Sequence, residues 1–311
     1  MKRTLLTAFA ALLAAAAFPA GMQAQTPADS LARVLQAENF RALTATASSV
    51  TVVATKKVPR AEFPLWLGHL TDGSWAPDGN WYPRETERLY LSRAGRDSSL
   101  DIVFSVPLDT CWSTPEPICA EAVSRGNEIY PMLSPDGRRL WFASDSLFGM
   151  GGYDLYEASW DPVKKRWGQV RNLGVPYNSK GDDLFFCDTP DGRYSVLVSN
   201  RDCDAASVII YVLRQEVTVQ RPVSPAEAEK LLHLAVTAPD NGYPFVKQSF
   251  GKVPDIPFAI SPEEEAEKAA AAAAKSKTKS KAKDTGKDKK GKKGKKESSV
   301  KIITEEYKIV K

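Results

Sequence analysis

Apolar residues along the chain fall into short groups separated by turn-forming residues. From Ser49 to Leu213, segments of a few residues rich in Val, Tyr, Phe and Trp are broken by Pro, Gly, Asn or Asp. Short apolar segments bounded by such residues are typical of β-strands. The pattern therefore predicts an all-β domain over residues 49–213.

Helical patterns flank this domain on both sides. Apolar residues recur near helical spacing within residues 25–48, which predicts an N-terminal helical segment. After the domain, Ser224 followed by Pro225 is a typical helix start. We therefore expect residues 214–260 to contain a short helix and then an irregular surface segment, because prolines interrupt the later part.

A sequence unit recurs inside the β-rich region. Pro-Asp-Gly triplets at 135–137 and 190–192 stand 55 residues apart, and a degraded earlier copy begins with WAPDG at Trp75. In such a triplet Pro fixes φ, Asp bonds to nearby backbone and Gly accepts a positive φ, which together form a tight turn. Repeats of this length made of short strands predict four antiparallel strands in each copy.

The copy that starts at Tyr130 also carries the segments GMGGYDLYEASW and NSKGDD. Its acids Asp154, Asp182 and Asp183 more often satisfy turn amides than bind calcium, although both interpretations remain open. We predict a structural role for the residues that make up the repeat motifs. They are Pro135, Asp136, Gly137, Gly151, Gly152, Tyr153, Asp154, Asn178, Asp182, Asp183, Pro190, Asp191 and Gly192.

The order of these motifs resembles the WD40-like, PD40-type β-propeller repeat of TolB-like proteins, especially the version in outer-membrane-associated proteins of bacteria with type IX secretion. The resemblance covers about Trp66 to Leu213 and implies a β-propeller. Three copies are recognisable, whereas closed propellers typically have four or more blades. We therefore expect a small or incomplete propeller of about three to four four-stranded blades, with residues 50–70 or 236–260 as sources of further strands.

The N-terminus has the pattern of an export signal. Lys2 and Arg3 precede an apolar run from Leu5 to Phe18, and small residues lead to a cleavage site after Ala24. The run is shorter than the roughly 20 residues that span a bilayer, and no comparable run follows. We expect residues 1–24 to be removed and the mature chain, with no transmembrane segment, to lie in the periplasm, with association at the inner face of the outer membrane.

Four cysteines would accompany the chain into an oxidising compartment. Cys111 and Cys119 bracket a short Pro-containing loop and are predicted to form a disulfide. Cys187 and Cys203 are expected at opposite ends of a strand, too far apart for a bridge, and receive no partner.

The C-terminal third changes composition. Residues 261–274 predict an exposed helix rich in Ala and Glu, 275–298 a disordered Lys-rich linker, and 299–311 a terminal β-strand. The chain's net charge of +4 includes +10 from residues 275–296 and +2 from the signal, so the remainder is about −8. The linker is either a solvated spacer or a contact for an acidic surface such as lipopolysaccharide or anionic lipid. Export argues against nucleic acid as a partner.

Catalytic groups are scarce in this composition. His69 and His233 are the only histidines and lie in separate non-repeat segments, so a Ser-His-Asp or Cys-His site is not expected. No CxxC pair occurs, and we predict no metal and no cofactor. A glycosidase with two carboxylates is not excluded by counting acids.

Three tryptophans, Trp66, Trp75 and Trp81, gather in the least regular part of the repeats. They either cap a core or line a ligand groove. The sequence therefore predicts a non-enzymatic scaffold of the cell envelope that binds other envelope proteins. A glycan-binding or glycan-cleaving propeller is the alternative.

Overall fold

The computed structural model describes residues 34, 37–83, 87–95, 98–120, 124–214, 220–236, 245–252, 257–260 and 266. Met1–Ala259 form one compact unit, and Ile260–Lys311 form a second, of which two residues are described. Within the described residues no helix is long and apolar enough to cross a membrane.

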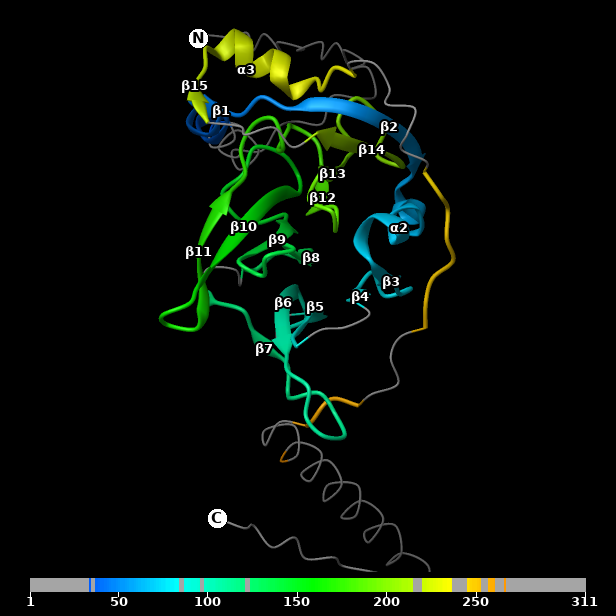
Figure 1. Ribbon diagram of the computed structural model, residues 1–311. Coiled ribbons are helices and arrows are strands. Elements are labelled where there is room, and N and C mark those ends of the chain that lie inside the picture. The colour runs from blue at the N-terminus through cyan, green and yellow to red at the C-terminus, as the bar shows by residue number, and fades with distance from the viewer. Residues whose placement is uncertain are drawn as a thin grey trace, which may run out of the picture. The chain divides into compact units, whose positions relative to one another are not determined.

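Most described elements are β-strands (Figure 1), as the sequence predicts. In chain order the elements are β1 (Thr46–Ala47), β2 (Thr51–Pro59), the 3-10 helix η1 (Arg60–Trp66), α2 (Gly68–Thr71), β3 (Gly73–Trp75), β4 (Trp81–Pro83), β5 (Leu89–Ala94), β6 (Leu100–Ser105), β7 (Glu116–Pro117), β8 (Glu128–Leu133), β9 (Arg139–Ser144), β10 (Asp154–Asp161), β11 (Arg166–Asn172), β12 (Asp183–Asp188), β13 (Tyr194–Ser199), β14 (Ser207–Arg214), β15 (Arg221–Pro222) and α3 (Pro225–Leu232).

The clearest repeat copy folds into four antiparallel strands, in the order β11-β10-β9-β8. We call this the second sheet. Its β9 has the sequence RLWFAS, and every residue after the first is buried. A strand apolar on both faces is stable only where both faces are covered, so this sheet needs a neighbour on each side. The predicted meander is confirmed.

The three Pro-Asp-Gly turns share one geometry. In all three copies the aspartate Oδ1 accepts the amide of the residue two positions later, at 2.9 Å for Asp78 and 3.1 Å for Asp136 and Asp191. The glycines occupy the left-handed region that other residues rarely adopt. Their φ values are 82° at Gly79, 69° at Gly137 and 65° at Gly192. The predicted turn chemistry is therefore present in all three copies.

The last repeat copy is completed by a strand from before the repeats. This third sheet has the order β12-β13-β14-β2, and β2 pairs antiparallel with β14 from Thr51 opposite Arg214 to Pro59 opposite Ser207. The sequence suggested that residues 50–70 add strands to a further blade, and for residues 51–59 the structure corrects this. The pairing satisfies backbone groups that β14 would otherwise leave open at a sheet edge.

The degraded first copy is divided between two sheets. One is the hairpin β3-β4, and the other, which we call the first sheet, has the order β5-β6-β7. Strand β7 is two residues long and ends at Pro117. Proline lacks the N–H that a ladder requires, so this outer strand cannot extend as β11 does. The number of propeller blades stays a prediction.

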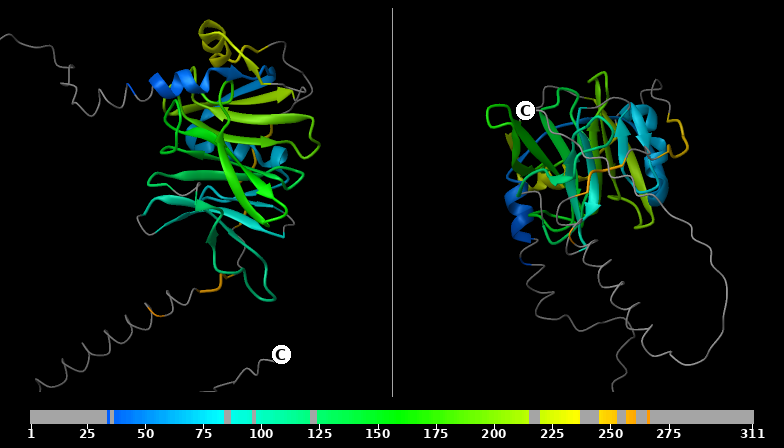
Figure 2. Two further views of the ribbon diagram at one scale, coloured as in Figure 1. Left: turned by 90° about the vertical axis from the view of Figure 1, so that its left-hand side faces the viewer. Right: turned by 90° about the horizontal axis from the view of Figure 1, so that it is seen from below.

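The larger sheets are stacked on one another (Figure 2). Strands β5 and β6 pack on β8, and β9 and β10 pack on β12. Phe63 of η1 reaches the second and third sheets, because its ring centroid lies 5.1 Å from Tyr130 and 6.4 Å from Phe185. The main core thus lies where η1 and β3 meet the first strands of these sheets.

The segment after the repeats agrees with its prediction where it is described. Helix α3 is capped by Ser224, whose hydroxyl accepts the Glu227 amide at 3.2 Å. Within residues 245–259 the described parts have no extended strand pairing and run along the other elements of the first unit. Their backbone amides bond to Leu65 from Gln248, at 2.7 Å, and to Trp75 from Gly251, at 2.8 Å.

Several predicted segments lie outside the described residues. These are the signal peptide at 1–24, the Lys-rich linker at 275–298 and the terminal strand at 299–311. Within the predicted segment 25–48, residues 37–43 are helical, and within 261–274 Ala266 is helical.

Candidate functional site

The GGYD and GDD motifs join the second sheet to the third. The Gly152 amide donates to the Gly181 carbonyl at 3.1 Å, and the Asp183 amide donates to the Tyr153 carbonyl at 2.7 Å. A Cβ atom at Gly151 would overlap the Gly181 carbonyl oxygen. Only glycine permits this approach, so the motif sets the distance between the two sheets.

The carboxyl groups of these motifs and the side-chain amide of Asn178 form hydrogen bonds and ion pairs at this junction. Asp183 accepts the Ser179 amide at 2.6 Å and pairs with Arg201 at 2.6 Å, with both side chains buried. Asp182 pairs with Arg60 and accepts the Tyr153 amide at 3.1 Å. Asn178 bonds to both the amide and the carbonyl of Leu155, at 2.7 and 2.9 Å. Among the described residues no group of three or more His, Cys, Asp or Glu is placed to hold a metal ion.

Among the carboxyl groups of the motifs, Asp154 has the pKa that departs most from its ordinary value. Its side chain is 1% exposed, and Oδ2 accepts the amides of Met150 and Gly151 at 3.0 and 2.9 Å. Burial raises the pKa of Asp154 to about 7 in spite of these hydrogen bonds. This carboxyl group therefore takes up a proton near neutral pH.

The three predicted groove tryptophans have different surroundings. Trp75 is 3% exposed and packs 5.5 Å from Phe185, so it belongs to the core. Trp66 lies under Lys56, whose Nζ is 4.2 Å from the ring centroid. Trp81 is partly exposed and lines a cleft. The groove prediction therefore applies to Trp81, and Trp75 follows the core interpretation.

That cleft, of about 470 Å³, draws on all three repeat copies. We call it the proline cleft because four of the residues that line it are Pro83, Pro131, Pro135 and Pro190. Trp81 Nε1 is buried and has no hydrogen-bond partner among the described residues, and a Cβ at Gly73 would lie 2.4 Å from it, so this nitrogen faces the protein. The proline cleft therefore combines an apolar wall with a partly exposed indole ring.

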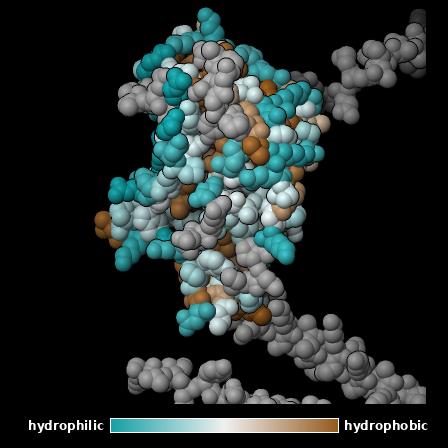
Figure 3. Space-filling model, turned by 45° about the vertical axis from the view of Figure 1, so that its right-hand side comes forward, coloured by the Kyte–Doolittle hydropathy of each residue, from teal (hydrophilic) through white to brown (hydrophobic). Residues whose placement is uncertain are grey.

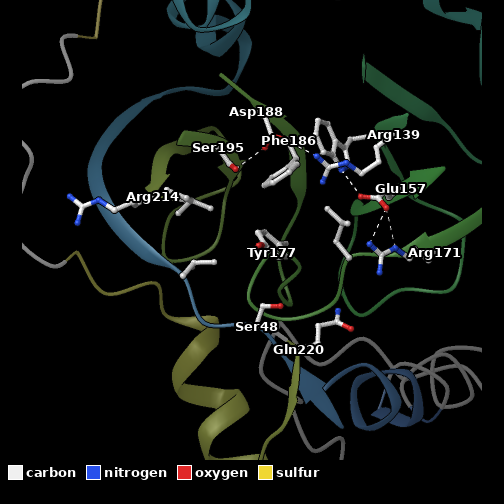
Figure 4. Close-up of a pocket in the computed structure, with 14 residues that line it drawn as sticks. Ser48, Arg139, Glu157, Arg171, Tyr177, Phe186, Asp188, Ser195, Arg214 and Gln220 are labelled. Atoms are coloured by element: carbon white, nitrogen blue, oxygen red, sulfur yellow. Dashed lines mark hydrogen bonds and ion pairs between the residues drawn. The ribbon is translucent and has the colours of Figure 1, made fainter. Parts of the chain in front are cut away.

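A second cleft, of about 460 Å³, lies between the second and third sheets and shares Asp188 with the proline cleft (Figure 4). We call it the arginine cleft. It is lined by Ser48, Val50, Arg139, Trp141, Glu157, Arg171, Leu173, Tyr177, Phe186, Asp188, Ser195, Leu213, Arg214 and Gln220. Figure 4 shows Arg139 and Arg171 on one side, next to Glu157, and Arg214 across the cleft.

Both carboxylates of the arginine cleft are buried and engaged. Glu157 accepts Trp141 Nε1 at 3.0 Å and two Arg171 nitrogens at 2.9 and 3.2 Å. Asp188 accepts the Ser195 hydroxyl at 2.9 Å and Arg139 Nη2 at 3.2 Å.

The arginines are much more accessible than these acids. Glu157 and Asp188 are 5% and 6% exposed, whereas Arg139 and Arg171 are 43% and 59% exposed. Arg214 is also exposed. The charge that a ligand would meet in the cleft is therefore positive.

Two of the three aromatic rings of the arginine cleft present little free face, whereas Tyr177 is half-buried. Trp141 is 1% exposed, and its ring is covered by the Arg139 guanidinium, 4.8 Å from the centroid. Phe186 is buried and packs edge-on against Trp141 and Tyr177, each at 5.1 Å. These rings support the arginines and the sheet junction.

None of the described cysteines and histidines lines either of the two clefts. Cys111 and Cys119, both within the described chain, are not joined by a disulfide in the structure, and their bridge stays a prediction. Cys187 is buried in β12, and the Cys203 thiol donates to backbone carbonyls at 3.2 Å. His233 Nδ1 lies 2.8 Å from Asp202 Oδ1 on an exposed surface.

The sequence did not single out the residues of the arginine cleft. Arg139 is the second residue after a Pro-Asp-Gly turn, and Arg171 lies in the segment WGQVRNLG. Neither arginine stands out from the other repeat positions in its own segment. The signal available in the sequence was weak, because β11 only shows Arg166, Gln169 and Arg171 at its exposed positions and a buried Trp167.

No family model matches this chain, and no curated protein matches it. The likeness to PD40-type repeats rests on the sequence motifs.

Proposed function

We propose that this chain is an exported, non-enzymatic protein of the bacterial envelope that binds other proteins through a scaffold of β-propeller-type repeats. The arginine cleft carries the proposal, because its carboxylates are buried and held by arginines while its guanidinium groups face outward. Acid-base chemistry on a glycan needs carboxylates that reach the substrate. This arrangement suits recognition better than catalysis.

The strand pairing supports a small propeller-like array. Strand β2 precedes the first repeat copy, yet it completes the sheet of the last copy. Such pairing joins the two ends of a repeat array and removes an open edge. The export pattern at residues 1–24 supports a periplasmic location, with the inner face of the outer membrane as the site of association. The Lys-rich linker would add contacts with lipopolysaccharide or anionic lipid.

The test is a mild crosslinking pull-down from envelope fractions, with the full chain compared with a chain truncated after Ala274. The proposal expects a discrete set of envelope proteins with both forms if recognition lies on the repeat sheets. Loss of the whole set on truncation would place recognition on the basic tail. Recovery of the chain as a lone monomer would contradict the proposal.

Glycan binding is the second candidate, and Trp81 is the observation that favours it. A partly exposed indole ring in a cleft of about 470 Å³ is a suitable stacking contact for a sugar ring. Binding to an envelope glycan panel that Trp81→Ala abolishes would support this role. Binding that this substitution leaves unchanged would contradict it.

A further inference from the structure

We propose that the arginine cleft binds an acidic segment of a partner protein, whose Asp and Glu carboxylates pair with the outward-facing guanidinium groups. The inference rests on the proposed function and names the site and the chemistry of the partner. It is carried by the burial of the acids and the exposure of the arginines in one cleft.

The first step is the electrostatics of the cleft. Its three arginines and two acids nearly balance in number. They differ in depth, because Glu157 and Asp188 are about one-twentieth exposed and the arginines that hold them are about half exposed. A buried carboxylate reduces the positive potential of the guanidinium group that it pairs with. It does not block the outer N–H groups of that guanidinium, which can still donate hydrogen bonds. An anion approaching from solvent therefore meets donors and positive charge.

The second step is that folding does not use all of this charge. Among the described residues Arg214 forms no ion pair and no side-chain hydrogen bond. It lies across the cleft from Arg139 and Arg171, and Figure 4 shows its guanidinium group turned outward, away from them. Outside the signal and the Lys-rich linker the chain has a net charge of about −8. The three accessible arginines around this cleft thus have the opposite sign to the net charge of that part of the chain.

The third step distinguishes a protein segment from a sugar acid. Sugar rings bind proteins largely by stacking on aromatic faces, and here Trp141 is covered by Arg139, Phe186 is buried, and the half-buried Tyr177 packs against Phe186. The more accessible groups are the planar guanidinium forks, which match a carboxylate in two parallel hydrogen bonds. Val50, Leu173 and Leu213 add apolar wall for the aliphatic part of Glu or Asp side chains.

The face drawn in Figure 3 shows no large apolar patch that could serve as a binding interface. There the hydrophobic residues are scattered among hydrophilic ones. Recognition on this face would depend on polar and charged contacts. The arginine cleft offers such contacts within a defined volume.

The test uses fluorescence anisotropy with the mature chain, residues 25–311, and two labelled eight-residue peptides. One peptide alternates Glu and Ser, and its control alternates Gln and Ser. We expect the Glu peptide to bind at least about tenfold more tightly, in keeping with charge-assisted hydrogen bonds. The Lys-rich linker is present in every protein variant, so differences between variants report on the cleft.

Two variants and one control locate the site. Arg214→Gln should weaken the Glu peptide by about threefold to tenfold, because one accessible charge is lost. The double variant Glu157→Gln with Arg171→Gln keeps the net charge and should weaken it similarly, because the exposed guanidinium is lost. Arg166→Gln removes an exposed arginine at the opposite end of β11 from Arg171 that does not line the cleft, and it should leave binding unchanged.

Each result is decisive for the inference. Equal weakening by all three changes, or by none, would overturn it and leave the proposed function to the pull-down. Tighter binding of a polyuronate or a phosphopeptide at the same site would also overturn it, since the partner class would be different. A pull-down without partners would instead contradict the proposed function, whatever the peptides show.

Discussion

Two buried carboxyl groups flank one serine in the second sheet. Glu128 and Asp154 both stand opposite Ser144 in the strand register. Each has one oxygen without a hydrogen-bond partner among the described residues. Burial raises the pKa of both groups, and that of Asp154 reaches about 7. The folded chain thus holds a proton that the unfolded chain releases near pH 4.

We expect the free energy of unfolding to fall as pH rises from about 4 to 7. The folded pKa is raised, so the unfolded state binds fewer protons in this window and is favoured as protons are withdrawn. Asp154 would contribute a slope of roughly 1 kcal/mol per pH unit. Urea unfolding of the wild type and Asp154→Asn from pH 4.5 to 7.5 measures it.

The Asn side chain keeps an oxygen for the two amides that Asp154 accepts and cannot titrate. The variant should therefore lose this part of the slope and be the more stable form at pH 7.5. Glu229→Gln, at an exposed ion pair with Lys180, is the control. The same slope in Asp154→Asn and wild type would show that Asp154 is not the responsible group.

Gly151 should be far less tolerant than Gly168. A Cβ at Gly151 would overlap the Gly181 carbonyl, whereas nothing lies within 4 Å of one at Gly168. Gly151→Ala should cost about 2 to 4 kcal/mol, because two backbone segments would have to separate. Gly168→Ala should change stability by about 1 kcal/mol or less. Chemical denaturation compares them, and equal costs would argue against a tight junction.

At the scale of elements, β2 is part of the core. Its Val58 is buried and belongs to the main core cluster, while Thr55 on the same strand is exposed. Val58→Ser should lower the free energy of unfolding by about 2 to 3 kcal/mol through lost burial and a cavity. Thr55→Ser should have a small effect. Similar small effects at both positions would mean that β2 only covers the third sheet loosely.

Local patterns predicted a large part of this fold. The Pro-Asp-Gly turns and the meander β8 to β11 follow from residues close in sequence, where turn chemistry and apolar spacing fix strand order. The pairing of β2 with β14 was not predictable in the same way. Alternation shows which side of a strand is buried but does not name the partner strand.

The arginine cleft escaped prediction for a related reason. Arg139, Arg171 and Arg214 come from three strands of two sheets, and each looks like an ordinary solvated residue in its own segment. The depth difference between them and their acids exists only after the sheets stack. The tryptophans gave a stronger sequence signal, yet Trp75 serves the core because its hairpin turns it toward Phe185.

At the scale of the whole molecule, residues 245–252 and 257–259 act as a strap on the first unit. They bond to η1 through Gln248 and Leu65, to β3 through Gly251 and Trp75, and beside the first sheet through Ala259 and Trp112 at 2.7 Å. Ending the chain at Val236 should therefore speed amide hydrogen exchange in β5 and β6 more than in β9. A chain ending at Ala274 keeps the strap and is the control. Equal exchange in both chains would show that the first sheet holds without it.

The closure of the third sheet by β2 also sets an order of events in time. Strand β2 is synthesised early, yet its partner β14 follows roughly 150 residues later, a separation that makes pairing slow. Until β14 emerges, β2 carries its apolar side without a sheet to join. The third sheet is therefore complete only after nearly the entire repeat array has been synthesised. A chain that stalls earlier would expose the unpaired β2 to quality-control factors.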